Sequence, residues 1–170
     1  MITVIQEAFP EIQERGCVTE INEKHLYIIE DLATKKAKFV SKTAENHLHI
    51  ENSCSSPYYF IQNDACVMQF EDTKQCDYVI FNNLDFYFCE IKVAIKIKTK
   101  SNHKLNAYKQ LESTYKFYSD KISFSNIVLH AIIVFPSKKR IVQASSSSKR
   151  KAFKVAFNID LKETNYIHFF

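Results

Sequence analysis

The sequence predicts an α/β (α+β) fold, with a central mixed sheet of about four to six strands flanked by helices. Two observations lead to this fold class. The spacing of apolar residues changes along the chain from the helical period of about 3.6 to the strand period of two, and then back. The 170 residues, 46% of them hydrophobic and 25% charged, have the composition of one ordinary globular domain. A single glycine excludes collagen-like chains and glycine-rich phosphate loops.

Residues 1–55 are expected to be mainly helical. Apolar residues between Ile5 and Ile12 recur at helical spacing, with Pro10 as an early break. A longer helix is expected over residues 20–40, with lysines near its C-terminal end, where the helix dipole favours cations. Its predicted apolar stripe consists of Ile21, His25, Ile28, Ile29, Leu32 and Phe39.

Residues 58–135 are expected to hold the core strands and one long helix. Alternating apolar residues predict strands that are separated by Asn- and Asp-containing turns, and the helical period then returns. A nearly continuous apolar run that ends at Pro136 predicts a strand buried on both faces. The expected elements are strands 58–62, 66–70, 77–81 and 84–97, a helix over 102–118, and a strand over 127–135.

The last part of the chain divides into two segments. Residues 136–152, which include four consecutive serines between basic clusters, are expected to be a basic flexible loop. Residues 153–170 are expected to form C-terminal strand elements, since Phe153, Val155 and Phe157 alternate with Lys154 and Ala156. All of these segments are expected to belong to one domain, residues 1–170.

The sequence predicts a cytoplasmic protein that does not enter a membrane. No apolar run approaches the roughly 18 residues of a membrane span, and the first residues do not resemble a signal peptide. The five cysteines include no CxxC pair, so free thiols in a reducing compartment are expected. A zinc site from His47, His49 and Cys54 is a weaker alternative.

Charge is distributed unevenly. Residues 1–76 carry 7 Lys/Arg and 12 Asp/Glu, a net charge of −5, whereas residues 77–170 carry 16 and 7, a net charge of +9. A basic half suits a phosphate-rich partner, which points to nucleic acid. The alternative is that the cations only form a solvated face.

The most informative stretch contains Asp77 on one expected strand and Glu90-Ile91-Lys92 on the next, with Asn82-Asn83 as the turn between them. Glu90 and Lys92 are two residues apart, so their side chains leave the same face of the strand. They are either a surface ion pair of little energetic weight or part of a metal site. In the second case Asp77 and Glu90 supply hard oxygen ligands for Mg²⁺, and Lys92 stabilises developing negative charge.

Asp77…Glu90-Ile91-Lys92 resembles the signature of the PD-(D/E)xK nuclease superfamily, and residues 104–115 resemble the helix that follows this motif in the family. The resemblance covers roughly residues 20–135. It implies a restriction-endonuclease-like core, with Asp77 and Glu90 as ligands of Mg²⁺ or Mn²⁺. The chain departs from the family pattern at two places. Cys76 stands in place of the proline, and Val93-Ala94 stand in place of a glycine turn.

The resemblance also implies roles for other side chains. Lys92 would be the catalytic lysine, and Gln110 an auxiliary polar residue that faces the site. An acid from the first long helix often completes the site in this family. Glu30 and Glu23 are both candidates for that acid, and no motif distinguishes between them.

A row of lysines continues beyond the motif at two-residue spacing. It can bind a phosphate backbone, or it can discourage pairing at the edge of a sheet. The residues concerned are Lys96, Lys98, Lys100 and, just beyond, Lys104.

The expected function is that of a metal-dependent nuclease, a hydrolase that cleaves phosphodiester bonds, with DNA as the expected substrate and self-association or a partner protein also expected. The alternative is a catalytically silent nuclease-fold module for binding or interaction, for example in a defence or toxin–immunity system. A third option is a structural domain in which Glu90 and Lys92 pair at the surface.

Overall fold

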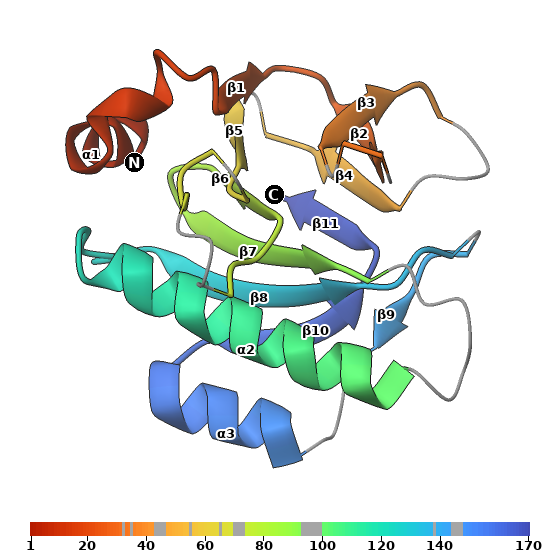
Figure 1. Cartoon of the computed structure of the whole chain (residues 1–170). Helices are drawn as coiled ribbons and strands as arrows, with labels where there is room; N and C mark the ends of the chain where they lie inside the picture. Colours follow the sequence, from red (N-terminus) through yellow and green to blue (C-terminus); the bar gives the residue numbers. More distant parts are fainter. Residues whose placement is uncertain are drawn as a thin grey trace.

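The computed structural model describes residues 1–31, 33–34, 36–42, 47–54, 56–64, 66–69, 74–92, 100–137, 139–143 and 148–170. These residues form an α+β fold with two mixed β-sheets (Figure 1). In chain order the elements are α1 (Ile2–Ala8), η1 (Pro10–Ile12), β1 (Val18–Ile21), β2 (His25–Glu30), β3 (Ala37–Val40), β4 (Leu48–Asn52), β5 (Tyr58–Gln62), β6 (Tyr78–Phe81), β7 (Asp85–Ile91), α2 (Lys100–Ser119), β8 (Val128–Val134), β9 (Val142–Gln143), α3 (Ser148–Phe157), β10 (Asp160–Thr164) and β11 (Tyr166–Phe169).

The larger sheet has seven strands in the order β1-β5-β6-β7-β8-β10-β9. Strands β1, β5, β6 and β7 pair antiparallel, whereas β8 runs parallel to both β7 and β10. Asn82 makes the tight β6–β7 turn, because its Oδ1 accepts hydrogen bonds from the backbone N–H groups of Leu84 (2.8 Å) and Asp85 (2.7 Å). The second sheet has four strands in the order β11-β4-β2-β3.

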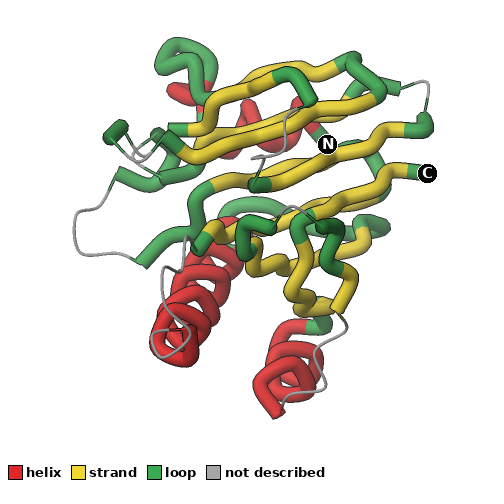
Figure 2. The backbone as a smooth tube through the Cα atoms, turned by 90° about the vertical axis from the view of Figure 1, so that its right-hand side faces the viewer, coloured by secondary structure: helices red, strands yellow, loops and turns green. Residues whose placement is uncertain are grey.

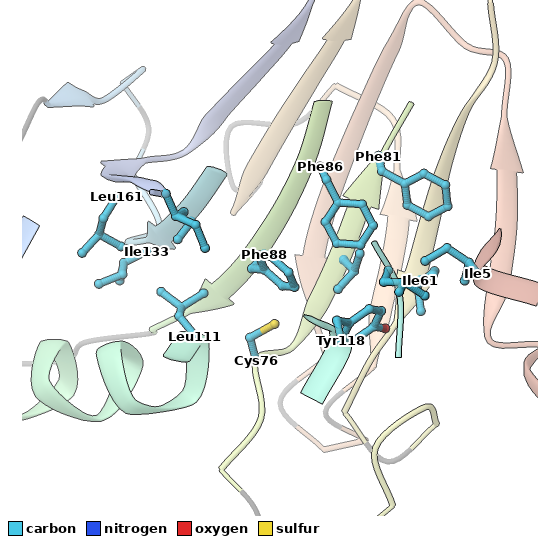
Figure 3. Close-up of a cluster of buried hydrophobic side chains, with 14 of the residues drawn as sticks. Ile5, Ile61, Cys76, Phe81, Phe86, Phe88, Leu111, Tyr118, Ile133 and Leu161 are labelled. Carbon is cyan, nitrogen blue, oxygen red and sulfur yellow. The ribbon is translucent and has the colours of Figure 1, made fainter. Parts of the chain in front are cut away.

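The described elements pack in three layers. One apolar cluster lies between the seven-stranded sheet and the helices, where Phe86 and Phe88 of β7 meet Leu111 and Tyr118 of α2 (Figure 3). A second cluster lies between the two sheets, where Leu26 and Ile28 of β2 face the larger sheet. Helices α2 and α3 therefore cover one face of the larger sheet, and the four-stranded sheet lies against part of the other (Figures 1 and 2).

The predicted helical character of residues 1–55 is wrong beyond η1. Residues 20–40 contain β2 and β3, and β1 and β4 flank them. In β2, Leu26 and Ile28 are buried and Tyr27 between them is not, so the true period there is two. The apparent helical stripe arose because a short apolar segment satisfies both periods. Leu32, which the stripe included, lies outside the described residues.

Two predictions for the C-terminal part are also wrong. Residues 153–157 belong to α3 rather than to a strand. Phe153 and Phe157 are one helical turn apart, with ring centroids separated by 4.9 Å, and Val155 is 88% exposed. The expected flexible loop over 136–152 contains β9 and the first residues of α3, while Lys138 and residues 144–147 lie outside the described part. Strands β10 and β11 confirm the rest of the predicted C-terminal strand elements.

Most of the elements predicted within residues 58–135 are confirmed. These are β5, β6, β7, α2 and β8, although residues 93–99 of the predicted long strand lie outside the described residues. The strand expected at 66–70 is reduced to one bridge between Met68 and Asp64, and Phe70 is not described. A central mixed sheet flanked by helices is thus present, and the second sheet was not predicted.

Cys17 and Cys66 form a disulfide, which contradicts the expectation of free thiols at these two positions. Cys54, Cys76 and Cys89 are free, and the last two are buried. Gly16, the only glycine of the chain, lies directly before Cys17 and has a φ of 64°, a conformation that favours glycine. Within the described ranges, no helix combines the length and the apolar character that crossing a bilayer requires.

Candidate active site

The β6–β7 hairpin brings two carboxyl groups together. Tyr78 pairs with Cys89, so the same register places Asp77, one residue earlier, opposite Glu90. The backbone N–H of Ile91 donates a 2.6 Å hydrogen bond to Oδ2 of Asp77, which fixes this carboxyl group at the end of β7. The predicted convergence of Asp77 and Glu90 therefore follows from the strand pairing.

Both carboxyl groups are removed from water. Asp77 is 8% exposed and Glu90 only 1%. Burial raises the pKa of Asp77 to about 7, although the hydrogen bond from Ile91 acts in the opposite direction. Burial, and next the negative charge of Asp77, raise the pKa of Glu90 well above its usual value. Two desolvated carboxyl groups that repel each other form a site in which a bound cation would be favourable.

Lys92 is the cation that this site already contains. Its Nζ contacts Oε1 of Glu90 in an ion pair and donates a 2.8 Å hydrogen bond to Oε1 of Gln110. The Lys92 side chain is 18% exposed, so the ammonium group lies between the buried carboxyl groups and solvent. The structure thus brings together Asp77, Glu90, Lys92 and Gln110, the four residues that the sequence singled out.

Helix α2 holds the segment before Asp77 in place. Nε2 of Gln110 donates a 2.8 Å hydrogen bond to the carbonyl of Gln75, so both ends of the Gln110 carboxamide are engaged. One turn further along, Oγ1 of Thr114 accepts a 2.8 Å hydrogen bond from the N–H of Cys76. Sequence reasoning missed Gln75 and Thr114. The four-residue spacing of Gln110 and Thr114 is the signal that could have linked them.

A buried asparagine ties the other end of this segment to α2. Asn63 is fully buried, and its Nδ2 donates a 2.8 Å hydrogen bond to the carbonyl of Cys76. Its Oδ1 accepts a 3.1 Å hydrogen bond from the hydroxyl of Tyr118. The loop that precedes Asp77 is therefore clamped near both ends.

Replacing Asn63 with alanine is expected to lower the free energy of unfolding by about 2–3 kcal/mol, because the Cys76 carbonyl and the Tyr118 hydroxyl lose a buried partner. Urea denaturation monitored by circular dichroism would measure this loss. Asn22→Ala, at an exposed position, is the matched control and should change stability by less than about 0.5 kcal/mol. Equal stabilities of the two variants would contradict the clamp.

The two candidate acids from the N-terminal half occupy different places. Glu30 is the last residue of β2 and shares the inward face of that strand with Leu26 and Ile28. Its charge is close enough to contribute, after burial, to the raised pKa of Asp77. Glu23 is exposed at the other end of β2, where its carboxylate accepts a 3.1 Å hydrogen bond from the N–H of Asn22. Glu30 is therefore the acid near the site, and it comes from a strand rather than from the expected helix.

Two of the four lysines of the expected row lie outside the described residues. Lys96 and Lys98 are not described, and Lys100 is the first residue of α2. Lys104 lies in α2, and its Nζ is 2.7 Å from Oε1 of Glu163, a buried carboxylate on β10. Sequence reasoning gave no role to Glu163, which holds Lys104 against the helix-covered face of the sheet.

The residues proposed for zinc do not gather into one ligand set. Nδ1 of His47 accepts a 3.0 Å hydrogen bond from the N–H of Glu30, whereas the ring of His49 stacks on Tyr27. Sγ of Cys54 contacts the carbonyl of Phe170. Among the residues that the structure describes, no group of three or more His, Cys, Asp or Glu side chains has an arrangement that could hold a metal ion.

Comparison of the chain with family models, with curated proteins and with solved structures gave no match in any of the three.

Proposed function

We propose that this chain is a metal-dependent nuclease of the PD-(D/E)xK type, which hydrolyses phosphodiester bonds in nucleic acid, with DNA as the expected substrate. One observation carries this proposal. Asp77 and Glu90 lie opposite each other in a buried position, and Lys92 forms an ion pair with Glu90 at the solvent side. An ion pair at the surface, the third option from the sequence, would not leave Glu90 with 1% exposure.

The arrangement of the strands supports a restriction-endonuclease-like core. Strands β5, β6 and β7 pair antiparallel, α2 follows, and β8 then lies parallel to β7. The resemblance implies three strands, a helix and a strand in this order after a first long helix, and β2 and β3 stand in place of that first helix. The carboxyl groups lie where β7 ends and α2 passes over the sheet, so the sheet and the helix both contribute to the site.

The donor set suits a hard divalent cation. Oε2 of Glu90 is buried and has no hydrogen-bond partner among the described residues, and Asp77 lies opposite it. Mg²⁺ or Mn²⁺ takes one or two carboxylate ligands and completes its coordination with water and phosphate oxygens, so Asp77 and Glu90 are the residues that would hold it. When bound, such an ion polarises the phosphoryl group and lowers the pKa of a water molecule.

The side chains of the chain itself have separate tasks in the hydrolysis. A water oxygen forms a bond to phosphorus, and the bond between phosphorus and the leaving oxygen breaks. The Lys92 ammonium group lies beside the carboxyl pair, where it can stabilise the negative charge that develops on the phosphate oxygens. Gln110 is a positioning residue, because its carboxamide holds the Lys92 ammonium group and is itself fixed by Gln75.

Replacing Lys92 with methionine is expected to lower the rate of metal-dependent cleavage by at least about 100-fold. Labelled single- and double-stranded DNA and RNA would be incubated with the protein in Mg²⁺, in Mn²⁺ and in EDTA. Lys116→Met is the matched control, since Lys116 is an exposed lysine of α2 that pairs with Glu112. The control should cleave like the unmodified protein, and EDTA should abolish cleavage by both.

Two results would overturn the proposal. Cleavage that is unchanged in Lys92→Met would place the reaction elsewhere. No cleavage by folded protein in either metal, with any of the four substrates, would leave the nuclease-fold binding module as the better description.

A further inference from the structure

The four-stranded sheet has one apolar face and one face rich in aromatic and imidazole rings. Its apolar residues, among them Leu26, Ile50 and Ile167, point toward the larger sheet. The residues that alternate with them along each strand point to the opposite face of the sheet, away from the larger sheet. On β2, β4 and β11 these residues are His25, Tyr27, His49, Glu51, Tyr166 and His168.

Strand pairing arranges these side chains in two rows. Tyr27 pairs with His49, which pairs with Tyr166, and this gives one row of three rings across three neighbouring strands. In the second row, His25 pairs with Glu51, and Glu51 with His168. We call the five rings, His25, Tyr27, His49, Tyr166 and His168, the ring platform.

The rings of the platform contact one another. Tyr27 and His49 stack with centroids 4.4 Å apart and planes inclined by 10°. The ring of His49 then meets Tyr166 edge-on at 5.2 Å, and the ring of His25 at 5.4 Å. Each of the five rings is exposed or half-buried. The sequence did not predict this platform, because its residues come from three strands, and two of these, β2 and β4, lie in the region that was expected to be helical.

Two cations, Arg140 and Lys42, lie at the edge of the platform. The guanidinium carbon of Arg140, an exposed residue, lies 3.3 Å from the centroid of the Tyr166 ring. Tyr27 pairs with Val40, so the same register places Lys42 beside His25. Burial and the charge of His25 lower the pKa of His49, and Arg140 and Lys42 add smaller contributions in the same direction. The carboxylate of Glu51, which lies between the rings, accepts a hydrogen bond from the Tyr166 hydroxyl. Planar rings bordered by basic side chains complement a ligand that combines flat bases with phosphates.

A cavity of about 380 Å³ adjoins the platform at β11. Tyr166 and His168 of the platform line it, together with Tyr87 and His130 of the larger sheet. The rings of Tyr87 and His130 stack with centroids 4.3 Å apart. The wall also contains the cations Arg140 and Lys162 and the carboxylate of Asp85, which lies 2.8 Å from Nε2 of His130. This volume lies within the range of small-molecule pockets, and its stacked walls suit a planar group.

We propose that the ring platform and the adjoining cavity bind single-stranded nucleic acid, with bases stacked on the rings and the phosphate backbone along Arg140 and Lys42. A duplex hides the faces of its bases, whereas a single strand presents them to such rings. The choice of nucleic acid as the ligand class agrees with the proposed nuclease function. The ring platform lies on the face of the four-stranded sheet that points away from the larger sheet, whereas α2 covers the opposite side of the larger sheet. The platform shares no residue with the carboxyl pair.

The test is fluorescence anisotropy of a labelled 12-nucleotide oligo(dT) and of a duplex of the same length, titrated with the full chain in EDTA. We expect the single strand to bind at least 10-fold more tightly than the duplex. Tyr27→Leu, which keeps apolar bulk but removes the ring, should weaken binding about 5- to 100-fold. Arg140→Gln, at an exposed position, should weaken binding and reduce its salt dependence.

Phe39→Ala is the matched control. Phe39 is a 42% exposed aromatic residue of β3 that pairs with the inward-facing Ile28, so it lies on the other face of the same sheet. This variant should bind like the unmodified protein. Equal binding by Phe39→Ala, Tyr27→Leu and Arg140→Gln, equal affinity for single strand and duplex, or no binding of the oligonucleotide would each overturn the platform.

The outcome is independent of the carboxyl pair, because EDTA removes the metal and cleavage is not measured. Binding in EDTA without cleavage in Mg²⁺ or Mn²⁺ would contradict the proposed nuclease and support the platform. Cleavage in Mg²⁺ or Mn²⁺, together with unchanged binding by Tyr27→Leu and Arg140→Gln, would support the nuclease and contradict the platform.

Discussion

Replacing Glu90 with glutamine is expected to abolish metal-dependent cleavage and, at the same time, to stabilise the metal-free protein. The reason for both effects is the same. Glu90 is almost fully buried opposite Asp77, and this burial, followed by the negative charge of Asp77, disfavours its charged form and raises its pKa. Glutamine has the same shape without the charge, so the variant is relieved of the repulsion, and its amide can donate a hydrogen bond toward Asp77.

The two effects should have opposite signs and different sizes. We expect the free energy of unfolding in EDTA to rise by about 1 kcal/mol, a gain typical when a functional group that strains the fold is removed. Cleavage should fall by at least about 100-fold, because one of the two carboxylates that would hold the cation is lost. Urea denaturation in EDTA and the cleavage assay in Mg²⁺ measure the two quantities.

The matched control is Glu112→Gln. Glu112 is an exposed carboxylate of α2 that pairs with Lys116, so its loss should change neither quantity appreciably. A large destabilisation by Glu90→Gln, with cleavage retained, would mean that Glu90 and Lys92 form a structural ion pair. That result would favour the third interpretation of the sequence, a structural domain.

The centre of the candidate site could be predicted because it depends on local rules. Alternation within one strand places Glu90 and Lys92 on the same face, and the Asn82 turn sets the register that brings Asp77 opposite Glu90. The resemblance of the motif added Gln110, one residue of a helix whose period was clear. Each of these inferences spans few residues or follows one regular element.

The parts that could not be predicted depend on contacts between distant segments. Glu30 reaches the site because β2 packs on the larger sheet, and the ring platform exists because β2, β4 and β11 are neighbours. The apolar residues of β2 are compatible with both a helix and a strand, so periodicity alone did not decide between them. The Cys17–Cys66 pairing belongs to the same class, since the spacing of cysteines does not determine which of them pair.

The disulfide is expected to contribute more to the stability of the fold than the Asn63 hydrogen bonds or the Glu90 side chain. It joins residues 49 positions apart and closes a loop that includes β1 to β5. In the chain-entropy description, a cross-link over a loop of this length destabilises the unfolded state by about 4 kcal/mol. The Cys17→Ala/Cys66→Ala double variant should lose about this free energy of unfolding in urea, compared with the oxidised protein.

The position of the disulfide connects this loss to the candidate site. Cys66 follows Asn63, which begins the loop that ends at Asp77, and the carbonyl of Cys17 accepts a 3.0 Å hydrogen bond from the N–H of Gln62 at the end of β5. The double variant should therefore also free the start of the loop that Asn63 and Gln110 clamp, and hydrogen exchange of residues 63–64 and 66–69 should become faster. Cys54→Ala, which removes a free thiol, is the control for both measurements.

A reducing agent should destabilise the unmodified protein and Cys54→Ala, and it should leave the double variant unchanged. Equal stability of the double variant and the oxidised protein would mean that Cys17 and Cys66 are not linked in solution, and the Asn63 clamp would then hold the loop by its hydrogen bonds alone.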